Sequence, residues 1–214
     1  RLKFTVDLSK GADQWLYILI AQQALLCYKT AMTSLKDFEK RFSEATGEEP
    51  GTVRYSARRL QEADHIPTGK RGGMNSPPLS AEHGAMFALG FYGAKATPKR
   101  TAQIAQAFST LQAELDGPTL LEDMEELIRC YAGQKGRFSD IRIERILFIA
   151  WEDWPEVEVE WTSLSDPKVN GVYGYRPAKD SRPPAFAEAI PATVVFGTFL
   201  KAIADALGLG DDDG

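Results

Sequence analysis

The chain has 214 residues, of which 43% are hydrophobic and 26% are charged, so it is long enough to bury a sizeable core. It carries a formal net charge of −5 and contains two cysteines and two histidines. No apolar run reaches the roughly 18 residues of a membrane span, and no Cys or His cluster has the spacing of a structural zinc site. The composition therefore argues against a membrane protein, and it predicts no metal and no cofactor.

The cysteines and the N-terminal region bear on the compartment. Cys27 and Cys130 could form one disulfide, but two distant cysteines without CxxC spacing are more typical of reduced thiols. Nothing near residue 1 resembles a signal peptide. We therefore expect a cytoplasmic protein.

Charge is distributed unevenly along the chain. Residues 52–100 hold eight Lys and Arg against three Asp and Glu, whereas residues 101–214 hold ten against twenty. A basic middle beside an acidic remainder makes local charge more informative than the total. The basic part can therefore contact an anionic partner while the acidic part would repel it.

The first elements are a strand and an apolar helix. Residues 1–8 alternate apolar and polar side chains, which predicts a strand. Residues 12–32 are rich in Leu, Ile and Ala around most of a helical circumference, so that helix should be buried in the core or against a second subunit.

Two helices joined by a short turn follow. Ser34 is a suitable N-cap, Asp37 can complete a capping box, and Gly47 ends the first helix. Residues 48–51 are predicted to form the turn, and the second helix covers residues 52–64, with Thr52 as N-cap or first-turn residue.

The helix over residues 52–64 has an apolar stripe of Val53, Ala57 and Leu60. Its other face is rich in arginine, which can donate two hydrogen bonds to guanine in a major groove. The alternative is an amphipathic helix whose arginines are merely solvated. The side chains expected to contact DNA from this helix are Thr52, Arg54, Tyr55, Arg58 and Arg59.

The next segment, residues 69–76, places adjacent cations in a Gly-rich loop. Glycine permits tight turns and close approach to phosphate, and cations there would add salt-sensitive phosphate contacts. A loop or short two-stranded wing is predicted, with Lys70, Arg71 and Asn75 on DNA. An ordinary solvated surface loop is the alternative.

Residues 35–73 resemble the winged helix-turn-helix regulators of bacteria and their prophages, in which a pattern such as "TV...AR.L...G.IP.G.RG" follows the turn. The departures are Asp64–His65, where a small residue and Gly are usual, and the acidic turn EEPG. The resemblance implies transcriptional control by operator binding, as in a repressor, with residues 52–64 as recognition helix and residues 69–76 as wing. The matching residues are Thr52, Val53, Ala57, Arg58, Leu60, Ile66, Pro67, Gly69, Arg71 and Gly72.

Two further helices complete the N-terminal part. One begins at Ser80 and is rich in aromatic and small residues, and the other covers about residues 98–115. Gly117-Pro118 lies where the charge changes sign, which favours a domain boundary. Residues 1–116 are therefore predicted to form a mostly helical domain, with the helix-turn-helix at residues 33–78.

Residues 118–214 are predicted to form a small α+β domain with two to three antiparallel strands and flanking helices. A helix begins near residue 120, and residues 141–151 and 156–162 alternate in strand fashion, with residues 169–176 as a third strand. Residues 192–208 begin as a strand or turn and end as a helix. Glu156, Glu158 and Glu160 would share an acidic face, either solvated or partner-binding.

These features favour a sequence-specific regulator that binds double-stranded DNA, with the C-terminal domain forming a homodimer or receiving a signal. No enzyme constellation occurs, because the chain lacks a GxSxG motif and a phosphate-cradling loop. One alternative is a phage DNA-packaging or replication component with a helix-turn-helix. Another is a protein-interaction module that does not bind DNA, with the acidic strands as its contact surface.

Overall fold

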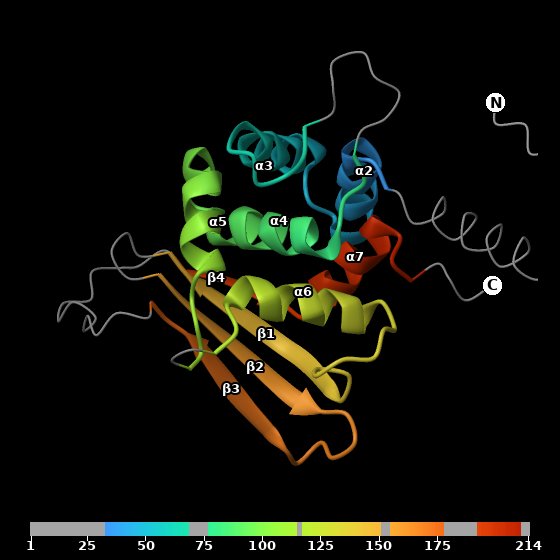
Figure 1. Cartoon of the computed structure of the whole chain (residues 1–214), viewed down its shortest axis with the longest axis vertical. Coiled ribbons are helices and arrows are strands. Elements are labelled where there is room, and N and C mark those ends of the chain that lie inside the picture. The colour runs from blue at the N-terminus through green and yellow to red at the C-terminus, as the bar shows by residue number, and fades with distance from the viewer. Residues whose placement is uncertain (1–32, 69–76, 115–116, 151–154, 178–191, 211–214) are drawn as a thin grey trace, which may run out of the picture.

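The structure, a computed structural model, describes residues 33–68, 77–114, 117–150, 155–177 and 192–210. Helices cover one face of a four-stranded antiparallel sheet (Figure 1), which confirms the predicted α+β class. Several of the predictions above concern residues that lie outside these ranges. They are the strand at 1–8, the helix at 12–32, the wing at 69–76 with Lys70, Arg71 and Asn75, and the thiol of Cys27.

Helix α2 spans Leu35–Thr46 and has the two ends that the sequence predicts. The Ser34 hydroxyl accepts a hydrogen bond from the Asp37 backbone N–H at 3.2 Å. Gly47 ends the helix with a φ of 71°, in the left-handed region that favours glycine. These caps stabilise α2 where its backbone groups lack helical partners.

Helix α3 spans Pro50–Glu62 and begins two residues earlier than predicted. The Glu49 carboxylate accepts a hydrogen bond from the Thr52 N–H at 2.6 Å, so Glu49 and not Thr52 is the N-cap. Pro50 follows at the first helical position, where its missing N–H has no cost. The predicted four-residue turn is therefore wrong, and three residues, Gly47 to Glu49, join the helices. Beyond α3, Asp64 has a φ of 58°.

Helix α4, Ala81–Gly93, lies at the centre of the helical layer (Figure 1). Eleven of its thirteen residues are buried, because α3, α5, α6 and α7 all pack around it. The predicted start at Ser80 is confirmed, since Ser80 and His83 form a reciprocal capping box. The surrounding elements are the 3₁₀ turn η1 (Pro98–Arg100), α5 (Thr101–Ser109), α6 (Leu120–Tyr131) and α7 (Thr198–Leu207). The helix predicted over 98–115 thus ends at Ser109.

The sheet has the order β3-β2-β1-β4, with every pair antiparallel. Its strands are β1 (Ile141–Ile149), β2 (Glu156–Ser163), β3 (Asn170–Tyr175) and β4 (Ala192–Phe196). The first three form the meander that the sequence predicts. The fourth exceeds the predicted two to three strands and pairs with β1, at the edge opposite to β3. A register shift in β1 between Ile143 and Arg145 marks a bulge.

One hydrophobic core contains residues from both sides of the predicted boundary at Gly117-Pro118, which falls between α5 and α6. The rings of Phe38 in α2 and Phe87 in α4 pack edge to face, and so do the rings of Tyr92 in α4 and Phe199 in α7. The inner face of the sheet adds Ile146, Phe148, Val157 and Val159 to this core.

The opposite face of the sheet is not covered by any described helix (Figure 1). The predicted acidic ladder lies on this face, yet arginines neutralise part of it. Arg145 pairs with Glu160, and Arg176 pairs with Glu156 at 2.6 Å. None of the helices in the described ranges is long and apolar enough to cross a membrane.

Candidate nucleic-acid interface

Helix α3 divides into a buried stripe and an exposed basic face. Val53, Ala57 and Leu60 are fully buried, as the spacing predicts, and they fix the rotation of the helix. That rotation exposes Arg54 and Arg58, whose side chains are 73% and 74% accessible. The face lies at the end of the molecule away from the sheet (Figure 1), so the acidic strands do not cover it.

Tyr55 joins the two arginines on this face and is 40% exposed. An exposed tyrosine ring offers both apolar contact area and a hydroxyl, which suits an interface better than a freely solvated site. Arg54, Tyr55 and Arg58 thus form the exposed face of α3, and this name is kept below.

Acidic side chains border the exposed face. Arg54 lies 3.7 Å from Glu39 of α2, and the Nε of Arg58 donates to Glu62 at 2.9 Å. The hydrogen bond from Arg58 is the largest of the effects that lower the pKa of the Glu62 carboxyl, so this group stays ionised. A nucleic acid would have to compete with Glu62 for the Arg58 guanidinium.

The Arg59 side chain points toward the turn η1, unlike the side chains of Arg54 and Arg58, which are exposed. Its Nη1 donates to Glu62 at 2.8 Å, and its Nη2 donates to the Lys99 carbonyl at 3.3 Å. The Arg59 side chain therefore ties η1 to α3. As a result η1, which carries the exposed Lys99, lies beside α3.

The start of α3 is acidic, although helix N-termini commonly bind phosphate. Glu49 accepts hydrogen bonds from the backbone of α3 and from the Thr52 hydroxyl at 3.1 Å. The bonds from the Gly51 and Thr52 N–H groups, in that order, lower the pKa of Glu49, which keeps its negative charge. Thr52 is therefore committed within the chain, and a phosphate at this end would meet a carboxylate.

The predicted site thus separates into groups. Arg54, Tyr55 and Arg58 come together on one surface, whereas Thr52 bonds to Glu49 at the start of α3 and Arg59 bonds to the Lys99 carbonyl of η1. The sequence analysis missed the acidic neighbours, although the spacing of Glu62 four residues after Arg58 and of Glu49 immediately before a proline could have identified them.

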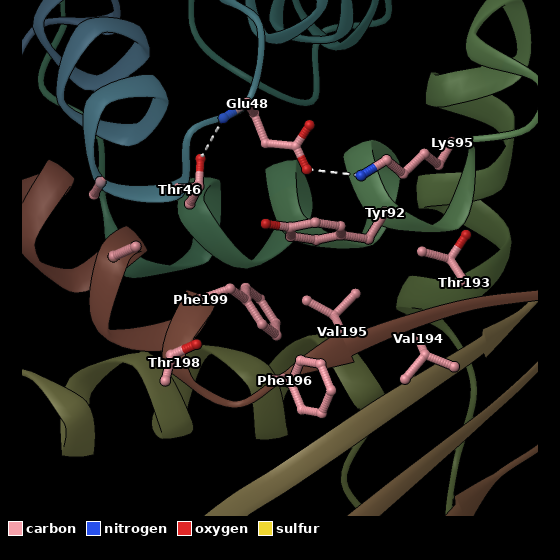
Figure 2. Close-up of a pocket in the computed structure, with 12 residues that line it drawn as sticks. Thr46, Glu48, Tyr92, Lys95, Thr193, Val194, Val195, Phe196, Thr198 and Phe199 are labelled. Atoms are coloured by element: carbon pink, nitrogen blue, oxygen red, sulfur yellow. Dashed lines mark hydrogen bonds and ion pairs between the residues drawn. The ribbon is translucent and has the colours of Figure 1, made fainter.

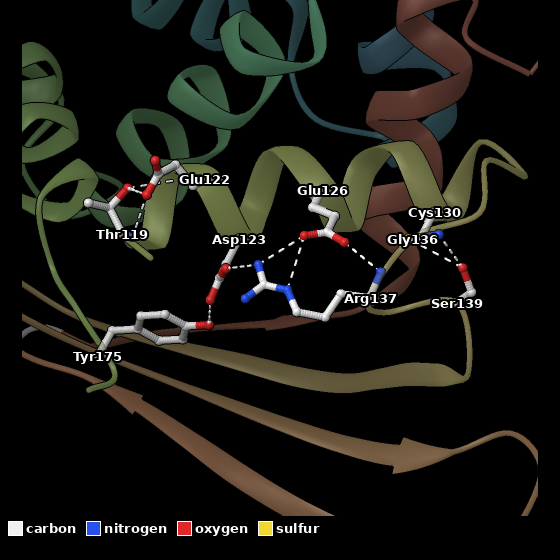
Figure 3. Close-up of polar contacts among 9 residues, drawn as sticks. All are labelled: Thr119, Glu122, Asp123, Glu126, Cys130, Gly136, Arg137, Ser139 and Tyr175. Carbon is white, nitrogen blue, oxygen red and sulfur yellow. Dashed lines mark hydrogen bonds and ion pairs between the residues drawn. The ribbon is translucent and has the colours of Figure 1, made fainter. Parts of the chain in front are cut away.

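A second polar cluster lies between α6 and the sheet (Figure 3). Asp123 is only 4% exposed, and it accepts a hydrogen bond from the Tyr175 hydroxyl at 2.6 Å. Arg137 pairs with Asp123 and also donates to Glu126 at 3.1 Å. Burial, followed by the bond to Asp123, raises the pKa of Tyr175. All of these groups have partners, which indicates a structural role.

Within the described ranges, no three His, Cys, Asp or Glu side chains lie close enough together to hold a metal ion. His83 uses Nδ1 to accept the Ser80 N–H at 3.0 Å, so it serves as a helix cap. Cys130 is a half-buried free thiol.

Comparison with protein-family models, curated proteins and solved structures finds no match to this chain.

Proposed function

We propose that this protein binds double-stranded DNA in a sequence-specific manner and regulates transcription, with α2 and α3 as a helix-turn-helix and α3 in the major groove. The observation that carries the proposal is the exposed face of α3, where two arginines and a tyrosine project from a helix fixed by buried residues. Arginine at such positions can donate two hydrogen bonds to guanine O6 and N7.

Lys99 of η1 supports the same proposal. The hydrogen bond from Arg59 to the Lys99 carbonyl holds this residue beside α3. Lysine there suits a backbone phosphate bordering the groove, which orients a protein on the duplex without reading sequence. Base reading is thus assigned to Arg54 and Arg58, phosphate contact to Lys99, and the positioning of η1 to Arg59.

The single variants Arg54→Ala and Arg58→Ala should each weaken binding to the preferred duplex about tenfold to a hundredfold. The reason is that each bidentate base contact contributes about 1–3 kcal/mol. Binding is measured by fluorescence anisotropy on duplexes selected from a random pool and on DNA flanking the gene, at two salt concentrations. In a plot of the logarithm of the binding constant against the logarithm of the salt concentration, each phosphate contact should contribute about −1 to the slope.

Arg129→Ala is the matched control, since Arg129 is also an exposed helical arginine paired to a glutamate, but it lies on α6 near the sheet. Its affinity should equal that of the unchanged protein. If the wild-type protein binds no duplex at low salt, the regulator proposal is wrong and so is the packaging alternative.

The competition by Glu62 gives a prediction of opposite sign. Glu62→Gln removes the carboxylate that holds Arg58 and Arg59, so affinity for the preferred duplex should rise about two- to fivefold. Glu158→Gln changes the net charge equally but lies on the sheet, and it should leave affinity unchanged. Equal gains in both variants would show that only overall charge matters.

Oligomeric state separates the proposal from its main alternative. A symmetric dimer predicts two half-sites about one helical turn apart in the selected DNA. A ring seen by mass photometry, with no preferred sequence, would instead favour a packaging or replication component.

A further inference from the structure

Strand β4 is an edge strand without the usual protection against pairing. It pairs with β1 on one side, and within the described ranges no strand pairs with its other side. Its sequence, Ala-Thr-Val-Val-Phe, contains neither a charged residue nor a proline, which commonly block an exposed edge. The opposite edge of the sheet differs, because Gln112 exchanges backbone hydrogen bonds with Arg176 just after β3. The edge of β4 is therefore open to a further strand.

The free edge of β4 presents the backbone groups of Val194 and Phe196. The Gly197 N–H donates to the Glu144 carbonyl, and hydrogen bonding alternates along an antiparallel pair, so the backbone groups of Val195 face β1. Val194 and Phe196, on either side of Val195, must direct their N–H and C=O groups away from β1. A strand beside β4 would satisfy these groups with ladder hydrogen bonds.

Val194 and Phe196 also have exposed side chains, with 50% and 68% of the residue accessible. The register places Val194 opposite Leu147 and Phe196 opposite Arg145, on the outer face of the sheet with the glutamates of β2. Side chains that lie side by side on one face of a sheet stabilise the pairing of their strands. An added strand would therefore need an apolar side chain at every second position.

A hollow of about 290 Å³ follows the free edge of β4 (Figure 2). Consecutive residues from Thr193 to Phe196 all line it, although their side chains alternate between the two faces, so the backbone edge of the strand forms one wall. Glu48 and Lys95 also line the hollow, and the Lys95 Nζ donates to Glu48 at 2.7 Å. In Figure 2 Lys95 lies toward the Thr193 end of β4, and Glu48 toward the Phe196 end. An added strand should therefore turn polar side chains toward this hollow.

Residues 1–8, which lie outside the described ranges, match both requirements. Their alternation puts four apolar side chains on one side and four polar side chains on the other, in the sequence Arg-Leu-Lys-Phe-Thr-Val-Asp-Leu. If this segment runs antiparallel to β4, Lys3 lies toward Glu48 and Asp7 lies toward Lys95, so each charge meets its opposite. Phe4 and Val6 would then pack on the outer face, beside the exposed side chains of β4.

The chain between this segment and α2 is long enough to reach β4. The Thr33 hydroxyl donates to the Leu207 carbonyl at 2.9 Å, which holds the start of α2 beside the end of α7. Helix α7 has ten residues and begins directly after β4, so its two ends are about 15 Å apart. Residues 9–32 would span about 36 Å even if all of them were helical.

We propose that residues 1–8 bind the free edge of β4 as an antiparallel fifth strand of the same chain. The sheet then has the order β3-β2-β1-β4 followed by residues 1–8. The added strand would lie beside the turn Gly47–Glu49, because Glu48 belongs to that turn and lines the hollow. This pairing does not depend on the proposed DNA binding.

Hydrogen exchange of the full chain, followed by ¹H–¹⁵N NMR, tests the backbone pairing. The Val194 amide should exchange about a hundredfold more slowly than an unpaired edge amide. The double variant Thr5→Pro/Val6→Pro removes the N–H donors of both orientations of the segment, so this protection should be lost.

Two amides provide the references for this measurement. Val172 has the same backbone orientation as Arg176, toward the free edge of β3, so its amide should exchange rapidly in both proteins. The Ile146 amide lies inside the sheet opposite Val195, and it should stay protected in both proteins, which shows that the variant is folded.

Carbodiimide cross-linking of the wild-type chain tests the side-chain pairing without any substitution. Mass spectrometry should find the Asp7 carboxylate joined to the Lys95 amine and not to the amine of Lys99, which is exposed on η1. In an equimolar mixture of ¹⁵N-labelled and unlabelled protein, each cross-linked peptide pair should carry a single label, since both residues belong to one chain.

The inference is overturned if the Val194 amide exchanges as fast as the Val172 amide. It is also overturned if the proline variant keeps the protection of Val194, because the edge would then have a different occupant. Cross-linked pairs with mixed labels would show that the segment pairs with a second copy, which would contradict pairing within one chain.

Discussion

Replacing Gly197 by alanine is expected to destabilise the protein by about 3 kcal/mol or more, because overpacking against an immobile backbone is among the most costly substitutions. An added Cβ would lie 2.0 Å from the Ile143 carbonyl oxygen and 2.8 Å from its carbon. These are backbone atoms beside the β1 bulge, so no side-chain rotation can relieve the clash. Strand β4 would have to separate from β1. The hydrogen bond that the Gly197 N–H donates to the Glu144 carbonyl at 3.4 Å opposes this separation.

Urea unfolding monitored by circular dichroism measures this effect, with the midpoint expected to fall and the slope to stay the same. Gly174→Ala is the matched control in β3, where the nearest atom to an added Cβ is the Arg176 guanidinium at 3.9 Å. Its stability should match or exceed that of the unchanged protein. Equal losses in the two variants would show that strand glycine itself, and not the contact with Ile143, sets the cost.

Asp123→Ala should also cost about 3 kcal/mol of unfolding free energy. The substitution removes the acceptor of the Tyr175 hydroxyl and one of the two carboxylates that hold Arg137. The Tyr175 hydroxyl would be left buried without a partner, which is more costly than the loss of an exposed ion pair. Because Asp123 joins α6 to β3, hydrogen exchange should accelerate in both elements.

Two tyrosine variants isolate the hydroxyl contribution. Tyr175→Phe deletes a hydroxyl that donates to a buried carboxylate, so it should cost about 1.5 kcal/mol. Tyr92→Phe deletes a hydroxyl that has no hydrogen bond to the described residues and is not fully buried, so it should change stability by less than about 0.5 kcal/mol. Equal losses would show that the Tyr92 hydroxyl also makes a stabilising hydrogen bond in the folded protein.

Local signals along the chain predicted most elements of the fold. Ser34 and Gly47 bound α2, and the alternation in β1 and β2 gave their antiparallel pairing because each strand buries one face. The early start of α3 was missed, since a glutamate is a less common N-cap than threonine. The place of β4 beside β1 was also missed. It depends on a connection across the whole sheet, which no local pattern encodes.

The candidate site was predictable only in part, for a related reason. The stripe of Val53, Ala57 and Leu60 sets which arginines of α3 are exposed, and helical periodicity contains that information. Arg59 was predicted to contact DNA. Its hydrogen bond to the Lys99 carbonyl joins residues forty positions apart, and helical periodicity cannot reveal such a contact. The environment of Asp123 likewise depends on a distant strand, because its partner Tyr175 lies 52 positions away, and the sequence analysis did not identify it.

The burial of α4 has a consequence for how the chain acquires its structure. This helix is apolar around nearly its whole circumference, and its contacts come from segments on both sides of residue 117. An isolated N-terminal half would leave α4 exposed where α6 and α7 pack, so we expect it to aggregate or to remain molten. Native contacts that join distant parts of a chain also slow folding. Helix α3 and the sheet should therefore unfold in a single cooperative transition.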